Sequence, residues 1–410
     1  MKRVIVIGGG ASGLMAAIMA AREGAKVTLI EKNRQAGKKL LATGNGRCNF
    51  TNRRQELSFY RSGYPELVEK VLEAYSMEDT VAFFEELGIL VKDRNGYLYP
   101  NSGQASSIAE VLRLEVQRLA RQHLIKEAYN TEVLGVEKQK DMFRVRTEGW
   151  TYEGEAVILA CGSEAAPKTG STGDGYRFAR ELGHQIIPPL PALTGVYVRE
   201  EDRGMLAGIR MDAKVTLRID GEACMEEKGE VQFASYGLSG IPVFQVSRYV
   251  SRALAEGRDC EIDLDMCPGH TEAELEEILK RHGERMKDRK GTDILMGMFP
   301  EKLSQMLLGR AGISLKKSRK DWTGQDCLRL AGQMKKLVFH LFGCRGYEQA
   351  QVCTGGVPLT ELKGTSMESA IVPGLYFVGE LLDVDGACGG YNLQWAWSSG
   401  SLAGTHAAGQ

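Results

Sequence analysis

The sequence predicts an α/β fold in which a segment of different character interrupts a parallel sheet. Residues 2–31 have the order strand, glycine turn, helix, strand, and residues 156–160 and 374–380 are apolar runs that lead into or end in glycine. Such runs are typical of strands that a parallel sheet buries on both faces. Because the runs flank a segment that is first β-rich and then helical, we expect the first and last parts of the chain to form one domain around an insertion.

The opening stretch predicts a phosphate-binding turn between a strand and an Ala/Met-rich helix. Its glycines occupy the G-x-G-x-x-G positions, which allow a tight turn, close approach of the backbone to a pyrophosphate, and close packing of helix on strand. Unpaired amides and the helix dipole favour an anion at such a helix start. The residues expected around the phosphates are Gly8, Gly10, Ala11, Ser12 and Gly13.

An acidic residue follows the second strand of this unit. Glu31 lies at about the spacing expected for the carboxylate that accepts hydrogen bonds from an adenosine ribose. A carboxylate there disfavours a 2′-phosphate, so the turn should hold FAD or NAD rather than NADP.

Composition limits the classes of partner. The 410 residues, 43% of them hydrophobic, suffice for a large core and for two or three domains. A formal charge of −1 gives no electrostatic case for nucleic acid. The densest basic run, Lys316, Lys317, Arg319 and Lys320, is interpreted as a solvated helix face, with phosphate binding as the alternative. We therefore expect a small-molecule substrate, and composition does not indicate an oligomeric state.

No stretch approaches the ~18 apolar residues of a membrane span. The apolar run after Lys2-Arg3 is broken by glycines after four residues, so we expect no signal peptide and a cytoplasmic protein without a membrane partner. Nine cysteines are scattered without a zinc-type spacing, so we expect reduced thiols and no metal site. Only Cys48 and Cys388 lie in glycine-rich stretches, where a small-residue role is favoured over a redox role.

Residues 32–52 predict a loop laid along a cofactor. They lack helical or strand periodicity, and the part from Gly37 to Asn49 combines glycines at 37, 44 and 46 with three cations. Glycine allows close approach, and Lys or Arg can face a phosphate or an electron-rich ring. A flexible surface loop is the alternative interpretation.

Two further glycine stretches should join the same site. Gly162 directly follows the apolar run 156–160, and ligands of open α/β sheets bind beyond the carboxyl ends of the strands. After the apolar run 374–380, a glycine-rich approach leads to a helix beginning near Leu393, which again makes an anion site and can stabilise negative charge on a reduced flavin.

The middle of the chain predicts an inserted segment. After the prolines at 188, 189 and 191 come short strands up to about residue 266 and then helices, the last expected at Asp326–Leu341. The predicted domains are 1–191 with 346–410, then 192–270 with 336–345, and the helical part 271–335.

The whole chain resembles the HI0933-like flavoproteins, which include BaiN-like and aminoacetone oxidase-like FAD-dependent oxidoreductases. The resemblance is carried by Gly8 to Gly13, Thr43-Gly44-Asn45-Gly46-Arg47-Cys48-Asn49, Gly170 to Gly175, Thr354 to Val357, and Gly374 to Trp397. It implies a Rossmann-like FAD-binding domain interrupted by a β-barrel-like domain with a helical subdomain. It implies FAD contacts at Glu31, Lys32, Lys38, Lys39, Thr43 to Asn49, Val133, Gly162, Gly379, Glu380, Asn392 and Leu393, and the predicted cofactor loop adds Gly37.

The chain departs from the family at one turn. Relatives often have Thr-His ahead of a Gly-Leu-Ser-Gly-Pro turn, where this chain has Ser235-Tyr236 ahead of Gly237. If that histidine serves the substrate in relatives, its role here is vacant or is taken by Ser235 or Tyr236.

Three functions remain open. The first is reduction of an activated C=C bond, of a steroid or bile-acid enone for example, by hydride from flavin N5; the second is oxidation of a small amine such as aminoacetone; the third is non-catalytic FAD binding. No second dinucleotide motif is present, so NAD(P)H, if it is the donor, visits the flavin transiently. The sequence does not identify the proton donor; Arg47 and Tyr391 are the candidates to test first, with a cofactor or packing role as the alternative for each.

Overall fold

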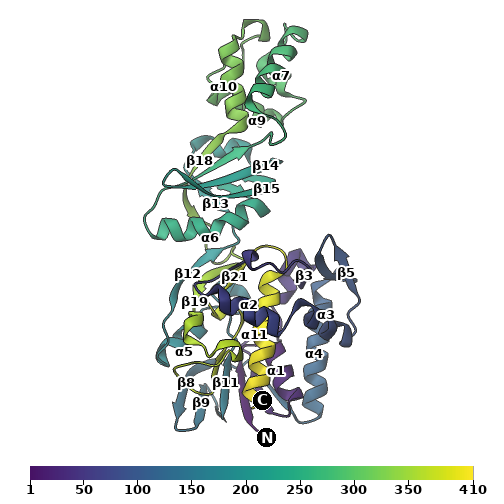
Figure 1. Ribbon diagram of the computed structural model, residues 1–410, viewed down its shortest axis with the longest axis vertical. Coiled ribbons are helices and arrows are strands. Elements are labelled where there is room, and N and C mark those ends of the chain that lie inside the picture. Colours follow the sequence, from purple (N-terminus) through teal and green to yellow (C-terminus); the bar gives the residue numbers. More distant parts are fainter. Residues whose placement is uncertain (410) are drawn as a thin grey trace. The chain divides into compact units, whose positions relative to one another are not determined.

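A computed structural model describes residues 1–409, without the side chains of Asp202 and Glu284; the predicted domain end at Gln410 lies outside the described residues. The chain divides into two compact units (Figure 1). Unit 1 combines residues 1–190 with those from 347 onward, and unit 2 comprises residues 191–346. Two distant parts of the sequence therefore build one unit, and the segment between them forms the other.

A five-stranded parallel sheet forms the centre of unit 1, as the sequence predicts. Its strands, in spatial order, are β20 (Leu375–Phe377), β11 (Ala156–Leu159), β1 (Arg3–Ile7), β2 (Lys26–Ile30) and β7 (Ile125–Ala128). Every neighbouring pair is parallel, so the carboxyl ends of all five strands lie at one edge of the sheet. The C-terminal strand β20 pairs with β11 and completes a sheet that the first 160 residues begin.

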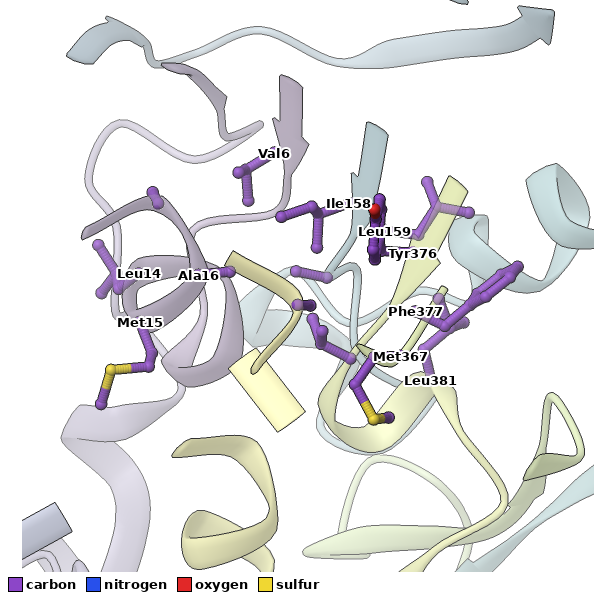
Figure 2. Close-up of a cluster of buried hydrophobic side chains, with 14 of the residues drawn as sticks. Val6, Leu14, Met15, Ala16, Ile158, Leu159, Met367, Tyr376, Phe377 and Leu381 are labelled. Carbon is purple, nitrogen blue, oxygen red and sulfur yellow. The ribbon is translucent and has the colours of Figure 1, made fainter. Parts of the chain in front are cut away.

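Two helices pack closely because glycines remove side chains from their contact. A Cβ at Gly400 would lie 2.5 Å from the carbonyl oxygen of Ser12, and one at Gly404 would lie 2.5 Å from that of Ala16. Helix α11 (Tyr391–Ala408) thus lies directly against α1 (Ala11–Arg22). Figure 2 shows the apolar core beside them, with Leu14 and Met15 of α1 near strand residues such as Val6 and Ile158.

The remaining elements of unit 1 surround this core. Its helices are α2 (Pro65–Ala74), α3 (Met77–Glu86), α4 (Ala105–Arg121) and α5 (Asp174–Glu181). Its smaller sheets contain β3 (Thr51–Asn52), β4 (Tyr60–Arg61), β5 (Val91–Arg94), β6 (Tyr97–Pro100), β8 (Val133–Gln139), β9 (Met142–Thr147), β10 (Thr151–Gly154), β12 (Ile187–Ala192), β19 (Val352–Gly356) and β21 (Asp385–Gly386).

Two local predictions in unit 1 are wrong. The sequence predicts one strand from Tyr152 to Ala160, but the strand splits at Glu155, because β10 pairs with β9 while β11 joins the central sheet. Ser107 and Glu110 predict a capping box with Ser107 as the N-cap, but it does not form, because the N-cap of α4 is Gln104, three residues earlier.

Six antiparallel strands form a closed ring in unit 2. They are β13 (Val196–Val198), β16 (Gly237–Ser239), β15 (Glu222–Ala234), β14 (Arg210–Ile219), β17 (Cys260–Asp265) and β18 (Leu337–Cys344), and β18 pairs back with β13. The helix α6 (Ile241–Ala255) packs on this ring. Between β17 and β18 the chain forms α7 (Glu272–Arg285), α8 (Gly291–Leu295), α9 (Glu301–Arg310) and α10 (Gly324–Lys335).

The last strand of the ring corrects the predicted helix Asp326–Leu341. Helix α10 ends at Lys335, and Leu337, Phe339 and Leu341 are buried while the residues between them are more exposed. That alternation is the period of a strand, and it places every second side chain in the interior of the ring. By contrast, Thr271 and Glu274 predict a capping box at the start of a helix, and the structure confirms it at the start of α7.

The predicted helix face of Lys316, Lys317, Arg319 and Lys320 is wrong. This segment is a turn that leads into a short 3-10 helix, Arg319–Asp321, and backbone bonds such as Arg319 N to Arg289 O at 2.9 Å hold it beside the stretch that follows α7.

Candidate functional site: a glycine-rich edge of the central sheet

The predicted phosphate turn leaves open space beside Gly10. A Cβ at Gly8 would lie 2.4 Å from the carbonyl oxygen of Ala160, and one at Gly13 would lie 1.9 Å from that of Gly8, whereas one at Gly10 would meet no atom within 4 Å. The first backbone bond of α1 runs from Leu14 N to Gly10 O at 2.9 Å, so the amides before Leu14 lack an i−4 partner in the helix. Free space next to these donors fits a pyrophosphate.

Glu31 is 8% exposed, and the turn holds its carboxylate in place. Its Oε2 accepts from the Gly9 amide at 2.7 Å, and its Oε1 accepts from the amide and the side chain of Asn33, each at 2.7 Å. A carboxylate has about four acceptor sites, so capacity remains for a ribose hydroxyl. The Thr131 amide donates to Glu31 O at 3.0 Å, which brings the segment leading to Val133 to this side of the sheet.

Lys32 and Lys38 lie beside the same turn with different partners. Lys32 Nζ lies 2.6 Å from Asp174 Oδ2 and also contacts Thr172, whereas Lys38 Nζ donates to Asn33 Oδ1 at 3.3 Å. Burial opposes ionisation of Asp174, but hydrogen bonds from Lys32 and Thr172 outweigh it and lower the pKa of the carboxyl. The predicted stretch 170–175 is therefore tied to the ribose side of the site.

Gly162 and Glu380 belong to neighbouring strand ends. A Cβ at Gly162 would lie 2.7 Å from Ser171 Oγ. The carboxylate of Glu380 accepts from Lys39 Nζ at 2.7 Å and from Ser163 Oγ at 2.9 Å. Three segments that are distant in sequence thus meet in one cluster that combines a cation, a carboxylate and a hydroxyl.

Asn49, the last residue of the stretch 43–49, and the two residues after it lie against the start of α11. A Cβ at Gly390 would lie 3.0 Å from Asn49 Oδ1, Thr51 Oγ1 donates to Gln394 Oε1 at 2.6 Å, and Trp397 Nε1 donates to Phe50 O at 2.9 Å. Asn49 Oδ1 is buried and has no hydrogen-bond partner among the described residues. A bound polar group would satisfy this acceptor.

The backbone of this stretch is strained. Asn45 and Cys48 have φ of 53° and 55°, in the left-handed region that non-glycine residues seldom adopt. Gly44, Asn45, Gly46 and Arg47 are exposed, whereas Cys48 is buried. Strain of this kind clusters at ligand sites, because the surrounding structure must impose it.

The N-terminus of α11 is open to a ligand. Gly390 is its N-cap with φ of 92°, and the first helical bond runs from Gln394 N to Gly390 O at 2.9 Å. The side chain of Asn392 is occupied, because its amide pairs with the N and O atoms of Gly386 at 2.8 Å each. Any contact of Asn392 and Leu393 with a cofactor therefore falls to backbone amides.

The structure distinguishes the two candidate polar residues. Arg47 is exposed and has no ion pair with any described residue. Tyr391 is 4% exposed and stacks on Phe59 with ring centroids 4.6 Å apart. Burial raises the pKa of Tyr391 to about 12 and that of Cys48 also to about 12, so neither ionises at neutral pH. The packing of Tyr391 favours the structural role that the sequence left open.

Sequence reasoning missed two polar residues of this edge, Asn33 and Ser163. Ser163 is fully buried beside Glu380, and Asn33 holds both Glu31 and, through Nδ2 at 3.0 Å, the carbonyl of Thr169. A signal existed, because each follows a predicted strand end by only a few residues, where side chains reach the ligand side of the sheet.

A parallel sheet with a glycine turn, unpaired helix amides and a buried carboxylate at the carboxyl edge of its strands has the arrangement of a dinucleotide-binding domain. The chain belongs to the HI0933-like family of FAD-dependent oxidoreductases: the family model described as "HI0933-like protein Rossmann domain" matches residues 2–406. No described helix is both long and apolar enough to cross a membrane.

Relatives with a stated activity match the chain over all or nearly all of its length. It is 39% identical over 410 residues to the 3-dehydro-bile acid delta(4,6)-reductase of Clostridium scindens, with 100% of this chain and 99% of that protein covered. It is 31% identical over 402 residues to the ribosomal RNA dihydrouridine synthase of Haemophilus influenzae, with 96% of each chain covered. Among solved structures, 3-ketosteroid delta1-dehydrogenase from Sterolibacterium denitrificans shares the fold, with a TM-score of 0.51, 12% identity and full coverage of both chains.

Proposed function

We propose that the protein reduces the C=C bond of an enone: NAD(P)H would reduce a bound FAD, the reduced flavin would supply the hydride, and a side chain would supply the proton. The observation that carries this proposal is the 39% identity, over the whole chain, to a reductase of 3-dehydro-bile acids. In such a compound a carbonyl at position 3 activates the C=C bond at position 4. The reaction named for the 31% identical relative is chemically similar, because the C5=C6 bond of uracil is conjugated to a ring carbonyl and is saturated in dihydrouridine.

We assign the cofactor contacts to the predicted residues by the chemistry that each offers. The α1 turn and its open amides suit the pyrophosphate, and Glu31 suits the ribose. The amides that begin α11 suit the electron-rich side of a reduced flavin, because a helix N-terminus stabilises negative charge. Lys39 and Glu380 suit polar groups between these two ends. Unit 1 is then the FAD domain, and unit 2 is the inserted barrel-like domain with the helical subdomain 271–335.

Tyr236 is the proposed proton donor. It follows Ser235 at the turn where the family resemblance implies a histidine, and its ring lies 5.7 Å from that of Tyr197 and 4.6 Å from the Arg345 guanidinium. The hydroxyl of a tyrosine side chain can serve as a general acid. Tyr236→Phe should lower kcat for a small enone by about 10²-fold or more while the FAD content and KM stay within about twofold. An unchanged kcat and an unchanged pH profile would remove Tyr236 from this role.

Anaerobic mixing tests the reaction itself. Under the proposal, NAD(P)H bleaches the flavin absorbance of the purified FAD-loaded protein, and a 3-keto-4-ene steroid restores it with one equivalent of saturated ketone formed. Bleaching by aminoacetone, followed by recovery in air with hydrogen peroxide, would instead establish an amine oxidase. If none of these compounds changes the flavin spectrum, the protein is a non-catalytic FAD binder and the proposal fails.

A further inference from the structure

A buried arginine of α4 holds the loop that follows Glu31. Arg113 is 9% exposed, and its Nε and Nη2 both donate to the carbonyl oxygen of Ala36, at 2.9 Å and 2.6 Å. Its Nη1 lies 3.2 Å from the carboxylate of Glu110, but the Glu110 side chain is 55% exposed, so solvent screens this ion pair. A positive charge is therefore buried beside the loop and is only weakly neutralised.

The carbonyl that Arg113 binds belongs to a peptide group that also contacts the phosphate turn. This peptide group joins Ala36 O to the N–H of Gly37, and in a trans peptide the two bonds point in opposite directions. Gly37 N donates to Gly9 O at 2.7 Å. Gly37 has φ of 79°, a conformation that favours glycine. Arg113 thus lies at one end of the peptide group 36–37, and the turn lies at the other.

The same arrangement repeats in the next peptide group. Gly9 O and the N–H of Gly10 share the peptide group 9–10, so Gly37 binds the oxygen on one side while the Gly10 N–H points to the other side. The amide of Gly9 is fixed as well, because it donates to Glu31 Oε2 at 2.7 Å. By contrast, the Gly10 amide has no hydrogen-bond partner among the residues that the structure describes, and a Cβ on Gly10 would meet no atom within 4 Å.

We propose that Arg113 is a positioning residue for FAD, which acts through the peptide groups 36–37 and 9–10 to orient and polarise the Gly10 amide toward the pyrophosphate. We call these two peptide groups the peptide relay. The inference rests on the assignment of the pyrophosphate to the α1 turn in the proposed function.

The sign of the charges agrees along the whole peptide relay. The guanidinium draws electron density toward Ala36 O, which makes the Gly37 N–H a stronger donor to Gly9 O. That bond in turn makes the Gly10 N–H a stronger donor, because hydrogen bonds in a chain polarise one another. An anion beside Gly10 therefore completes a sequence that begins with a cation, and each peptide dipole lies in the favourable direction between them.

A packing role for Arg113 makes a different prediction. If the side chain only anchors α4 to the loop, its loss should weaken every ligand of the site, including one without phosphate. The peptide relay predicts a loss that is confined to ligands with a phosphate group near Gly10. Adenosine and ADP separate the two roles, because they share the base and the ribose and differ only in the diphosphate.

Displacement of FAD from the loaded full-length protein, followed by flavin fluorescence, measures the affinities for FAD and for competing ADP or adenosine. Arg113→Met removes the guanidinium and keeps an aliphatic side chain. It should weaken the binding of FAD and of ADP about tenfold, while the affinity for adenosine stays within about twofold of native. The matched control is Arg121→Met, at an exposed arginine near the end of the same helix, and it should leave all three affinities within about twofold.

Two further variants separate the charge from the hydrogen bond and guard against failure of Arg113→Met to fold. Arg113→Gln keeps an N–H donor for Ala36 O without the charge, and Arg113→Lys keeps the charge. The affinity for ADP should fall about tenfold in Arg113→Gln and stay within about threefold of native in Arg113→Lys. Equal ADP affinities of these two variants would overturn the role of the charge.

The inference also fails if Arg113→Met binds FAD and ADP as the native protein does, if adenosine loses as much affinity as ADP, or if Arg121→Met loses as much as Arg113→Met. A weakened Gly10→Val variant beside an unaffected Arg113→Met overturns the peptide relay and keeps the pyrophosphate at the α1 turn. Native FAD affinity in both variants overturns both assignments. The expected affinities, in a protein that does not reduce an enone, support the peptide relay and overturn the proposed reaction.

Discussion

The cofactor edge of unit 1 and an exposed group of cations in unit 2 use positive charge in opposite ways. This second group, called the basic surface below, consists of Arg285, Lys287, Arg289, Lys290, Lys316 and Lys320. At the edge, Lys32 pairs with Asp174 at 2.6 Å and Lys39 pairs with Glu380 at 2.7 Å, in partly buried positions. On the basic surface, Lys287 and Lys290 are exposed and have no carboxylate partner among the side chains that the structure describes. Paired cations orient neighbouring segments, whereas unpaired cations remain available to an external anion. Whether carboxylates of the fold already neutralise the lysines near a site therefore says more about anion binding than the number of those lysines does.

The cofactor edge, unlike the exposed basic surface, has glycine positions at which no side chain fits. Gly13→Val, at such a position, should have the largest effect on the free energy of unfolding. A Cβ at this position would lie 1.9 Å from Gly8 O, so α1 cannot keep its distance from β1. We expect a loss of about 3 kcal/mol or more in the free energy of unfolding. Urea unfolding followed by circular dichroism measures it, and a native-like midpoint would show that the helix can move away without cost.

Gly10→Val changes a glycine of the same turn at a position where a side chain fits. Its effect on cofactor binding can therefore be separated from any effect on folding. Gly10 has an extended backbone with φ of −76°, and a Cβ there would meet no protein atom within 4 Å. We expect the unfolding midpoint of the FAD-free protein to stay within about 0.5 kcal/mol of native, while FAD affinity falls at least tenfold, about 1.4 kcal/mol. Titration of the FAD-free protein measures the affinity. Undiminished binding would place the pyrophosphate elsewhere.

In the helical part of unit 2, Asp326 should contribute to stability in a pH-dependent way, unlike the exposed carboxylates nearby. Burial opposes its ionisation, but hydrogen bonds from Lys317 and from Thr323 outweigh burial and lower the pKa of Asp326 to about 2. A carboxyl whose pKa is lowered by folding stabilises the protein fully when the pH is above the pKa of that carboxyl in the unfolded chain, near 4. This contribution is lost as the pH falls through the folded-state pKa of about 2.

Asp326→Asn should therefore destabilise the protein at pH 7 by about 1 to 2 kcal/mol. The difference from native should shrink between pH 4 and pH 2, as followed by urea unfolding across that range. Asp321→Asn, at an exposed carboxylate in the same region, is the matched control and should change nothing measurable. A constant difference at all pH values would mean that the amide disrupts packing and that charge is not the cause.

The sequence predicted what local chemistry determines. The α1 turn needs glycine for steric reasons, and the Thr271–Glu274 capping box places its own partners three residues apart, so both could be identified without tertiary information. Burial of the runs 156–160 and 374–380 in a parallel sheet was also predictable, because both are continuously apolar, whereas the pairing of β11 with β20 is visible only in the fold. The proximity of Asn49 to the start of α11 followed from the family motifs and not from either segment alone.

The sequence could not predict features that depend on distant partners. Leu337–Cys344 continues a helical pattern in sequence, and it becomes strand β18 only because β13 and β17 supply its hydrogen bonds. The split at Glu155 arises in the same way, since its two halves join different sheets. The basic surface depends on the bridge between Lys290 and Ser318, so its charges are separated in sequence and meet only in the fold.

Tyr391→Phe should have the smallest effect and tests the division of roles between the two units. The Tyr391 ring stacks on Phe59 and meets Tyr60 edge-on at 5.6 Å, and phenylalanine preserves both contacts. We expect the unfolding free energy to change by less than about 0.5 kcal/mol and kcat for a small enone to stay within about twofold. A drop in kcat comparable to that expected for Tyr236→Phe would instead assign the proton-donor role to Tyr391. The reason is that only the hydroxyl distinguishes tyrosine from phenylalanine. Since that hydroxyl belongs to a buried ring at the start of α11, such a result would also require the aromatic cluster to open during turnover.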